Sequence, residues 1–527
     1  MSTLFSEHFT FPVNPALLLG VTVLLLLAVQ VSTWLFDTKG LHRVPGPFFA
    51  KWTSLWYGFA GHSGRVDQII LDLHKRYGKV VRIGPNQVSI QDADALRSIY
   101  GFSSKALKSG FYDALVQFNG TPSSFLTRSR EDHTRKRKFV AHGLSMSSIL
   151  EFQPTISQYQ QQLVVHWDSM CAAAKLGKGG KIGSQFWTAR NGQAWFDCMP
   201  WLNYVAFDII GDLGFGKGFG MTASGTDIIQ IATDQTAAIE SFGSEKARLE
   251  TEDVPLVKTV LARGEFSITA ALMPVWARPI LRLLEPEGHK ALNTFGTIAA
   301  TSIQTRLSTP TDRVDLLSRM IEGRDDGGKP MNARELCAES TTLLGAGSDT
   351  TSNSSCAMIY YLARDQKKQL ALQKELDDVL GAPNASDSFE GHGGLYEKVK
   401  HLPYLEAVVN EGLRMYSTIG IGLPRVVPEG GLTVAGYTLT EGTVVGVPVY
   451  AVHHDASVWG PDVDTFNPER WLVEDKTTML NAFAPFSVGP RACVGRNLAM
   501  MELTTIIATL VHRYHFVLEH PGKKVII

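Results

Sequence analysis

The longest run of apolar positions lies close to the N-terminus. Residues 16–36 (ALLLGVTVLLLLAVQVSTWLF) carry no formal charge. As an α-helix they would span about 30 Å, the thickness of the hydrocarbon core of a bilayer. No Lys or Arg precedes this run, and Lys39, Arg43 and Lys51 follow it, which favours a retained anchor over a cleaved signal peptide. We therefore expect a short lumenal N-terminus at 1–15, one transmembrane helix at 16–36 and a cytosolic remainder.

Helical periodicity dominates the rest of the chain. The longest predicted helix covers 332–365, and Asn332 and Glu335 at its start have the spacing of a capping box. Further helices are predicted at 401–416 and from 496 to about 514. Most of the chain is therefore expected to be helical.

Strand-like patterns are confined to two short regions, 80–90 and 432–452, and Ala435-Gly436-Tyr437 in the second predicts a hairpin turn. The segment 44–47 (VPGP) cannot continue a helix, so we expect a hinge at 37–50 and one domain at 51–527. The expected fold class is mainly α with small β-sheets, preceded by the N-terminal transmembrane helix.

Composition and charge narrow the possible functions. The chain has 527 residues, with 50 Lys and Arg against 51 Asp and Glu, which disfavours a globally basic nucleic-acid binder. Its five cysteines are scattered and odd in number, a pattern typical of a reduced compartment rather than of a disulfide framework. They are Cys171, Cys198, Cys337, Cys356 and Cys493. A chemically important cysteine would therefore act alone.

Cys493 has the most distinctive surroundings of the five. It lies in the Gly- and Pro-rich segment 486–495 (FSVGPRACVG), directly before a predicted helix, whose free N–H groups and dipole favour a thiolate. Gly489 permits a turn with positive φ, Gly495 permits close approach of a flat group, and Arg491 offers a cation. A lone cysteine is more often a buried structural residue, but these neighbours favour a chemical role.

The pattern F-S-x-G-P-R-x-C-x-G resembles the haem-thiolate signature of the cytochrome P450 monooxygenases. Three further motifs stand in the order of that family: A-G-x-D-T-T at 346–351, E-x-x-R at 411–414 and P-E-R-[FW] at 468–471. The resemblance covers nearly the whole chain after the anchor. It implies haem b with Cys493 as the proximal iron ligand. It also implies that O2 is split, with one oxygen atom entering the substrate and the other reduced to water by electrons from NADPH.

The resemblance also implies roles for other residues. Asp349 and Thr350 would deliver protons to bound oxygen, whereas the alternative is that they only cap or kink a helix. Glu411, Arg414 and Arg470 would form a buried structural charge cluster. Gly347 would open a groove over the iron and Phe486 would shield the sulfur. His133 and Arg137 have the spacing of the family's propionate-binding W-x-x-x-R, with His in place of Trp. The full set of implied haem contacts is Phe486, Gly489, Arg491, Gly495, His133, Arg137, Arg425, Ala346 and Gly347.

Electron delivery is expected from a separate protein. The basic run 128–138 is also compatible with a nucleic-acid patch, but the anchor and the haem motifs argue against nucleic acid. Arg135, Lys136 and Lys138 are instead expected to face an acidic flavoprotein. The implied partners are NADPH–cytochrome P450 reductase, which carries the flavins and uses NADPH, and cytochrome b5 as a further candidate. The expected location is the endoplasmic reticulum membrane, single-pass, with the catalytic domain in the cytosol.

Four stretches are similar to the fungal benzoate 4-monooxygenase group within the family: 108–113, 131–138, 206–212 and 422–425. That group also shares His133 and Ser417. The implied reaction is para-hydroxylation of benzoate to 4-hydroxybenzoate. One alternative is a fungal secondary-metabolite tailoring oxidase acting on a larger aromatic or terpenoid skeleton. A second is a haem-binding protein without turnover, against which the Asp349–Thr350 pair argues.

The substrate carboxylate would need a polar partner, because burying an unpaired charge is costly. In the family, the loop before the helix of His133 roofs the distal pocket, and here it contains Lys108, Ser109 and Tyr112. We expect at least one of these to hold the carboxylate. The family also continues past its last helix into a sheet segment that touches substrate. This chain stops at Ile527, so we expect a truncated gene model or an incomplete pocket.

Overall fold

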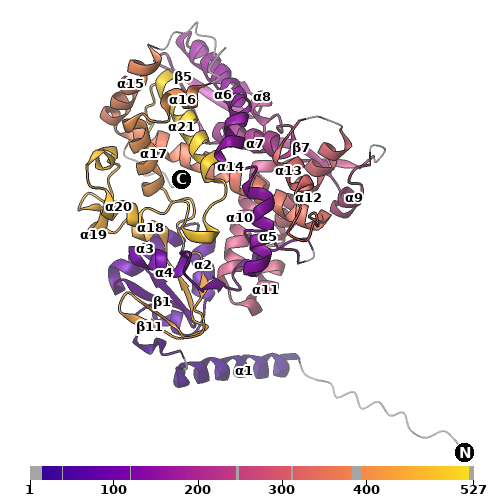
Figure 1. The fold of residues 1–527 in the computed structure, drawn as a ribbon, viewed down its shortest axis with the longest axis vertical. Helices are drawn as coiled ribbons and strands as arrows, with labels where there is room; N and C mark the ends of the chain where they lie inside the picture. Colours follow the sequence, from indigo (N-terminus) through magenta and orange to yellow (C-terminus); the bar gives the residue numbers. More distant parts are fainter. Residues whose placement is uncertain are drawn as a thin grey trace, which may run out of the picture.

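Helix α14 (Ala333–Arg364) crosses the middle of the body in the computed structural model, which describes residues 15–37, 39–118, 120–244, 248–309, 313–382 and 394–521 (Figure 1). The predicted capping box starts this helix. The Asn332 side chain accepts a hydrogen bond from the backbone N–H of Glu335 at 3.0 Å, and the Glu335 carboxylate accepts one from the N–H of Asn332 at 3.2 Å. The prediction of a helix at 332–365 is confirmed.

Helices form most of the molecule, as expected. The α-helices are α1 (Pro15–Phe36), α2 (Leu55–His62), α3 (Val66–Tyr77), α4 (Ala93–Tyr100), α5 (Arg130–Ala141), α6 (Met146–Lys175), α7 (Met199–Phe215), α8 (Met221–Ser224), α9 (Gln235–Glu240), α10 (Leu256–Leu272), α11 (Arg278–Leu284), α12 (Pro286–Ser308), α13 (Leu316–Glu322), α14, α15 (Gln366–Leu380), α16 (Leu395–Val399), α17 (Pro403–Met415), α18 (Val449–His453), α19 (Ala456–Trp459), α20 (Thr477–Ala482) and α21 (Arg496–Arg513). Helices α17 and α21 confirm the predictions for 401–416 and 496–514. Short 3₁₀ turns include η1 (Leu41–Arg43), η2 (Phe48–Lys51), η3 (Tyr112–Leu115), η4 (Val275–Ala277), η5 (Pro468–Leu472) and η6 (Gly489–Arg491).

Four small sheets accompany the helices. The largest has the strand order β1-β2-β12-β9-β3, with β12 parallel to β2 and the other neighbours antiparallel. The others are β10-β11, β4-β5-β6 and β7-β8. The strands are β1 (Val80–Gly84), β2 (Gln87–Ile90), β3 (Leu107–Lys108), β4 (Gly180–Ile182), β5 (Gln185–Arg190), β6 (Gln193–Phe196), β7 (Ile228–Ala232), β8 (Thr251–Pro255), β9 (Arg425–Val426), β10 (Leu432–Val434), β11 (Tyr437–Leu439) and β12 (Val444–Gly446).

Each of the two regions predicted as strands contains a β-hairpin. Residues 80–90 form the β1–β2 hairpin, in which Val80 pairs with Ile90. In the second region β10 and β11 pair across Ala435 and Gly436, both of which have positive φ (47° and 79°), so the predicted turn is confirmed. The end of that region was wrongly predicted as strand, because 449–453 form α18.

The main core surrounds α14. Every residue of α7 from Trp201 to Phe215 is buried, and α7 packs along α14. Helix α21 packs on α14 and α17 and is buried from Met501 onwards through most of its length. A second, smaller cluster lies between the five-stranded sheet and α4. These two cores fix the segments that flank Cys493.

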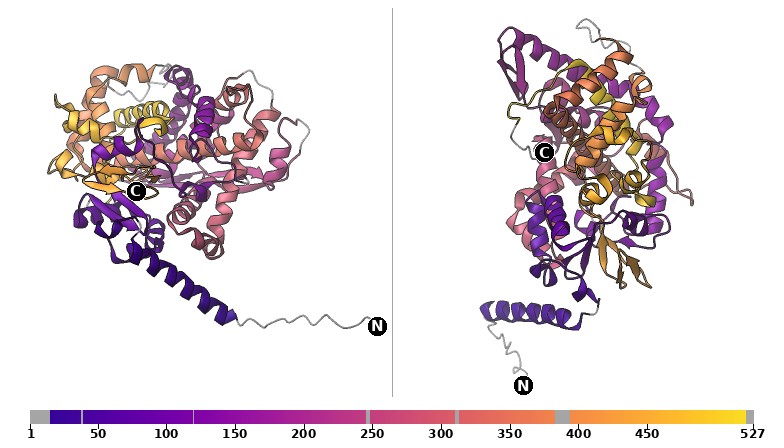
Figure 2. Two further views of the ribbon diagram at one scale, coloured as in Figure 1. Left: turned by 60° about the horizontal axis from the view of Figure 1, so that its bottom comes forward. Right: turned by 90° about the vertical axis from the view of Figure 1, so that its left-hand side faces the viewer.

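Helix α1 lies apart from the body in all three ribbon views (Figures 1 and 2). Among the residues that the structure describes, no helix was found that is both long and apolar enough to cross a membrane, so the expected span at 16–36 is not confirmed. The expected lumenal segment lies almost entirely outside the described residues, as do residues 522–527, on which the expectation about the C-terminus depends.

The expected hinge at 37–50 is packed against β1. The backbone N–H of Arg82 donates to the carbonyl of Pro45 at 2.7 Å, and a Cβ on Gly46 would lie 2.3 Å from the Arg82 carbonyl oxygen. Leu41 and Val44 are buried. Only a residue without a side chain fits this close approach. The segment, which we call the strap, connects α1 to the sheet and packs against it.

Candidate active site

Cys493 lies between η6 and α21, in a loop closed by its own backbone. The N–H of Cys493 donates to the carbonyl of Phe486 at 2.9 Å. Gly489 has φ 74°, as the sequence predicted, and a Cβ there would lie 2.1 Å from the Tyr100 carbonyl oxygen. The loop is thereby held against the end of α4. The Cys493 side chain is exposed. Among the described residues other than the two chain neighbours of Gly495, a Cβ on Gly495 would have only Sγ of Cys493 within 4 Å, at 3.9 Å. This leaves room beside the sulfur for a flat group.

Opposing effects act on the Cys493 thiol. Desolvation is the largest and raises its pKa, whereas the backbone N–H groups of Gly495 and Arg496 and the charges of Arg137 and Arg496 lower it. Arg491, the cation expected near the sulfur, makes its hydrogen bonds to another segment. Its guanidinium instead donates to the carbonyls of Thr127 (3.0 Å) and Ser129 (2.9 Å). A metal at the sulfur would displace the proton directly.

Four cations surround His133 on α5. Burial and the charges of Arg491, Arg137, Lys108 and Arg425 lower the pKa of His133 to about 3, so its ring is neutral. Burial and the charge of Arg425 similarly lower the pKa of Arg491 to about 10.

Within the part of the chain that the structure describes, Arg137, Arg425 and Arg491 have no ion-pair partner. Arg137 donates to the Ala492 carbonyl at 2.7 Å and Arg425 to the Tyr112 hydroxyl at 3.1 Å. Buried positive charge is costly unless anions balance it. The two propionates of a haem would supply such anions, next to the loop of Cys493. The structure therefore brings together the four residues predicted to bind them: His133, Arg137, Arg425 and Arg491.

The three residues predicted to hold the substrate carboxylate lie at this same cluster. The Lys108 ammonium donates to the Phe125 carbonyl and lies 4.2 Å from the centroid of the Tyr112 ring. Lys108, Ser109 and Tyr112 are all buried, and Ser109 Oγ accepts from the N–H of Phe111 at 3.3 Å. These contacts associate Lys108 and Tyr112 with the propionate-binding cations. Their predicted role toward substrate stays a prediction.

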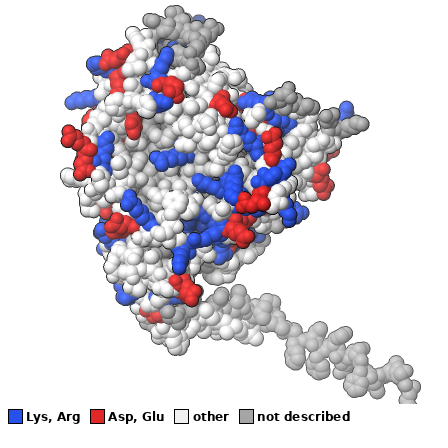
Figure 3. Space-filling view, in the orientation of Figure 1, with Lys and Arg blue, Asp and Glu red and all other residues white. Residues whose placement is uncertain are grey.

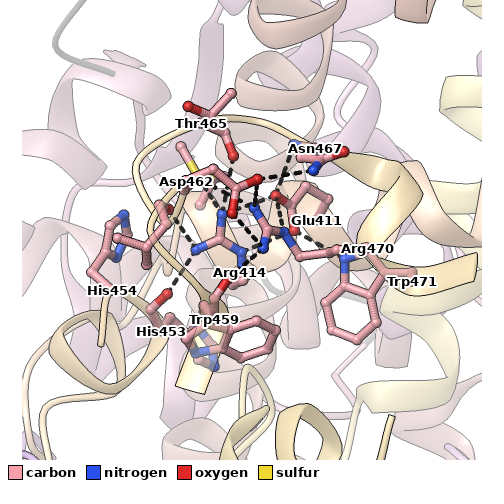
Figure 4. Close-up of polar contacts among 12 residues, drawn as sticks. Glu411, Arg414, His453, His454, Trp459, Asp462, Thr465, Asn467, Arg470 and Trp471 are labelled. Atoms are coloured by element: carbon pink, nitrogen blue, oxygen red, sulfur yellow. Dashed lines mark hydrogen bonds and ion pairs between the residues drawn. The ribbon is translucent and has the colours of Figure 1, made fainter. Parts of the chain in front are cut away.

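Glu411, Arg414 and Arg470 form one buried cluster, as Figure 4 shows. Arg414 donates to both carboxylate oxygens of Glu411, at 2.9 and 2.8 Å, and Arg470 donates to Oε1 at 3.0 Å. The carboxylate also accepts from the Trp471 indole N–H and the Asn467 backbone N–H, each at 2.9 Å. Glu411 and Arg414 are 0% exposed. The hydrogen bonds of this carboxylate are thus supplied from both α17 and η5.

His453 connects this cluster to the cysteine loop, a connection that sequence reasoning missed. Its backbone carbonyl accepts from Arg414 at 2.7 Å, and its Nε2 accepts from the N–H of Ala484 at 3.1 Å. Since Nε2 accepts, Nδ1 carries the proton and donates to Ser417 Oγ at 2.9 Å. Burial, with the charges of His454 and Arg414, holds the pKa of His453 well below its usual range. The neutral ring therefore fixes the loop two residues before Phe486.

On α14, Thr350 and Ala346 lie on one face. Thr350 Oγ1 donates to the Ala346 carbonyl at 2.6 Å, which leaves the hydroxyl lone pairs free to accept. Ala346 is exposed although it is in the middle of the helix. Burial raises the pKa of Asp349, whereas the charge of Arg263 and a hydrogen bond from Asn353 (3.1 Å) act in the opposite direction.

Gly347 lies where two helices approach closely, and its expected role over the iron stays a prediction. A Cβ on Gly347 would lie 2.8 Å from the side chain of Ile210 on α7. The glycine therefore lets α7 and α14 pack closely. Phe486 is partly buried, and the Arg496 guanidinium lies 5.8 Å from its ring centroid.

The basic residues expected to face an electron donor are differently placed. The prediction is wrong for Lys136, which is 2% exposed and donates to the Pro122 carbonyl at 2.6 Å. Arg135 is half-buried and paired with Asp132 and Glu335, and only Lys138 is exposed, with Asp326 at 2.7 Å. Figure 3 shows basic and acidic side chains next to one another over the part of this face where α5 lies.

Comparison with known proteins agrees with this geometry. Residues 43–527 match the protein-family model described as Cytochrome P450. The chain is 37% identical over 498 residues to benzoate 4-monooxygenase bphA of Aspergillus niger, an alignment that covers 92% of this chain and 89% of that protein.

Two other fungal relatives show lower identity. Cytochrome P450 monooxygenase ORF11 of Penicillium roqueforti is 30% identical over 501 residues, covering 94% of this chain and 93% of its own. Cytochrome P450 monooxygenase gsfF of Penicillium aethiopicum is 28% identical over 506 residues, covering 93% and 92%. A family model that matches nearly the whole body, together with relatives aligned along 89–93% of their length, shows that this chain belongs to the cytochrome P450 family and is a P450 monooxygenase.

Proposed function

We propose that this monooxygenase hydroxylates benzoate at the para position. The observation that carries the proposal is the 37% identity to the Aspergillus niger benzoate 4-monooxygenase along 92% of the chain, against 28–30% for the other two relatives described. The reaction would be benzoate + O2 + NADPH + H⁺ → 4-hydroxybenzoate + NADP⁺ + H2O, with the two electrons arriving through a reductase.

The residues of this chain support that chemistry. A haem, when bound, supplies O2 activation, and the thiolate of Cys493 would be its protein ligand. Arg137, Arg425 and Arg491 would hold its propionates. The Thr350 hydroxyl would accept a hydrogen bond on the oxygen side, and Asp349 would pass protons toward it.

The test is product analysis with the purified, haem-loaded protein, NADPH and a fungal P450 reductase. The expected result is 4-hydroxybenzoate that carries one atom of ¹⁸O when the reaction is run under ¹⁸O2. If benzoate is not consumed but a larger aromatic or terpenoid compound is, the enzyme is a tailoring oxidase. If NADPH is consumed with no compound of the panel oxidised, the benzoate proposal is also overturned.

Electron delivery and location are part of the same proposal. We propose that the reductase docks on the face that carries α5, since Lys138 is exposed there and Arg137 approaches the cysteine loop. We also propose attachment to the cytosolic side of the endoplasmic reticulum membrane through α1. Residues 16–36 carry no charge, and the side chains of Leu17, Leu24, Leu25 and Leu35 are 62–66% exposed.

A further inference from the structure

A cationic side chain on α10 is directed at the middle of α14. The guanidinium of Arg263 lies 4.3 Å from the centroid of the Phe295 ring on α12. It also lies against Gly345 of α14, where a Cβ would be 3.1 Å from Nη2 of Arg263 and 3.3 Å from the Phe295 ring. The aromatic ring attracts the guanidinium, and the lack of a side chain at position 345 leaves space for it.

Arg263 lacks the partner that such a group normally has. Over the residues that the structure describes, its side chain makes no hydrogen bond and no ion pair, and its Nε is buried and unpaired. The charge of Asp349 acts on Arg263, but no ion pair joins the two. The side chain as a whole is half-buried. A guanidinium stays charged in proteins, and a charge that is partly removed from water is costly without an anion in contact with it. The position is therefore suited to an anion from outside the chain.

Helix geometry places this cation beside the reactive side of α14. Residues four apart share a helix face, so Gly345 and Asp349 form one strip, and Ala346 and Thr350 form the neighbouring strip. Arg263 lies over the first strip, and the exposed Ala346 and the relay residue Thr350 belong to the second. An anion on Arg263 would thus lie next to the segment that is proposed to bind oxygen.

We propose that Arg263 binds the carboxylate of an aromatic acid substrate and so determines which ring carbon meets the activated oxygen. The planar fork of a guanidinium matches a carboxylate with two parallel hydrogen bonds, and Phe295 offers an aromatic neighbour for the ring. With the carboxylate fixed at one end, the para carbon is the far end of the ring. This inference rests on the proposed function and specifies its substrate-binding residue.

Lys108 is less suited to the same task, because burial and the charges of Arg425 and Arg491 hold its pKa well below the usual range. Its ammonium already donates to the Phe125 carbonyl and is next to the Tyr112 ring, within the cluster that would hold the propionates. Lys108 is on β3, whereas Arg263 is on α10 and is not part of that cluster. A sequence signal for Arg263 was absent, because a single arginine in a helix of mixed composition has many ordinary explanations.

The experiment measures binding to the haem-loaded, full-length protein by calorimetry and by the ligand-induced haem absorption change. The ligands are benzoate, cinnamate and 2-naphthoate, with benzaldehyde as the neutral analogue. The variants are Arg263→Met, Arg263→Lys and Lys108→Met. Lys258→Met is the matched control, since Lys258 is an exposed cation on the same helix.

Arg263→Met is expected to weaken benzoate binding by about 10- to 100-fold and benzaldehyde binding by less than about twofold, the range for losing hydrogen bonds to a charged group. Arg263→Lys should fall between, Lys258→Met should match the wild type, and the Arg263→Met enzyme should spread hydroxylation over several ring positions. A purely structural arginine would change neither the acid-to-aldehyde ratio nor the position of attack.

The other possible outcomes would contradict the assignment of Arg263, the proposed benzoate function, or both. If Arg263→Met weakens both ligand classes equally or neither, or if Lys108→Met alone shows the acid-selective loss, the assignment of Arg263 is wrong. If the wild type binds cinnamate or naphthoate but not benzoate, and Arg263→Met weakens those acids selectively, the benzoate function fails while the anchor stands. If the wild type binds only neutral compounds, both fail.

Discussion

Cys493 is the residue whose replacement has the most specific expected outcome. It lies two residues before the N-cap of α21, and the charges of Arg137 and Arg496 act on its sulfur. Cys493→His should lose the red-shifted carbon monoxide absorption that a thiolate ligand produces, because an imidazole donates less electron density to iron. The half-buried Cys171→Ser serves as control and should retain it. Retention of that spectrum by Cys493→His would show that another group is the ligand.

Replacement of Thr350 should change the amount of product formed per NADPH more than the rate at which NADPH is consumed. Its hydroxyl is anchored on the Ala346 carbonyl and keeps its lone pairs available. Thr350→Ala should still consume NADPH, but product per NADPH should fall by at least about tenfold, with hydrogen peroxide in its place, the scale for losing one proton-transfer group. Thr350→Ser should restore most of the coupling. Equal coupling in Thr350→Ala and the wild type would remove Thr350 from the relay.

At the scale of elements, the Glu411 carboxylate joins α17 to η5. Glu411→Gln would leave the buried Arg414 and Arg470 without their counter-charge, and breaking a buried pair in this way typically costs about 3–5 kcal/mol. Thermal unfolding of the haem-loaded protein measures the loss. Glu406→Gln, an exposed position on the same helix, is the control. If both variants unfold at the same temperature, the cluster does not stabilise the fold.

A second carboxylic acid connects α21 to α14 and predicts a pH dependence. Glu502 is buried, its Oε2 accepts from Thr351 Oγ1 at 2.9 Å, and burial raises its pKa from 4.5 to about 8. The folded state therefore keeps a proton that the unfolded chain releases. The contribution of protonated Glu502 to the free energy of unfolding is complete below about pH 4.5. It is lost as the pH rises through about 8, at roughly 1.4 kcal/mol per pH unit between those values.

Glu502→Gln removes this titration and retains the acceptor for Thr351. The melting temperature of Glu502→Gln minus that of the wild type should therefore increase steadily from pH 5 to pH 8. Burial raises the pKa of Glu339 as well, to about 7, but this residue is present in both proteins and cancels in the difference. A difference that stays flat over that range, as expected for the exposed Glu441→Gln, would mean that Glu502 is ionised in the folded state.

Local sequence signals predicted the elements that position the site. The capping box at Asn332 and the positive-φ turn at Ala435-Gly436 each depend on neighbouring residues alone, so they could be predicted from the sequence. What the sequence did not show depends on contacts between distant segments. The side chain of Ile210, on another helix, occupies the space where a side chain at position 347 would lie. The buried Lys136 donates a hydrogen bond to the Pro122 carbonyl, which is also on another segment. Arg263 and His453 gain their significance only from helices far away in the chain.

At the scale of the whole molecule, α1 is separable from the catalytic body. It lies apart from the body in Figures 1 and 2, whereas the strap that follows is anchored by Asp37, whose carboxylate accepts from the N–H of Leu41 at 2.8 Å. Deletion of residues 1–36 leaves Asp37 and this hydrogen bond in the chain. The truncated protein should therefore bind haem normally and melt within about 2 °C of the full chain, since none of the described side chains of α1 belongs to the core.

The same deletion tests the proposed membrane attachment. In a flotation assay with phospholipid vesicles, the full chain should float and the truncated chain should stay at the bottom. A full-length variant with Leu24→Arg and Leu25→Arg should behave like the deletion, because each arginine in the apolar centre of the helix costs about 2.5–3.5 kcal/mol in a bilayer. If the truncated chain still floats, attachment comes from the body. The exposed side chains of Phe48, Phe49 and Leu283, at 67%, 67% and 82%, are then the surface to alter.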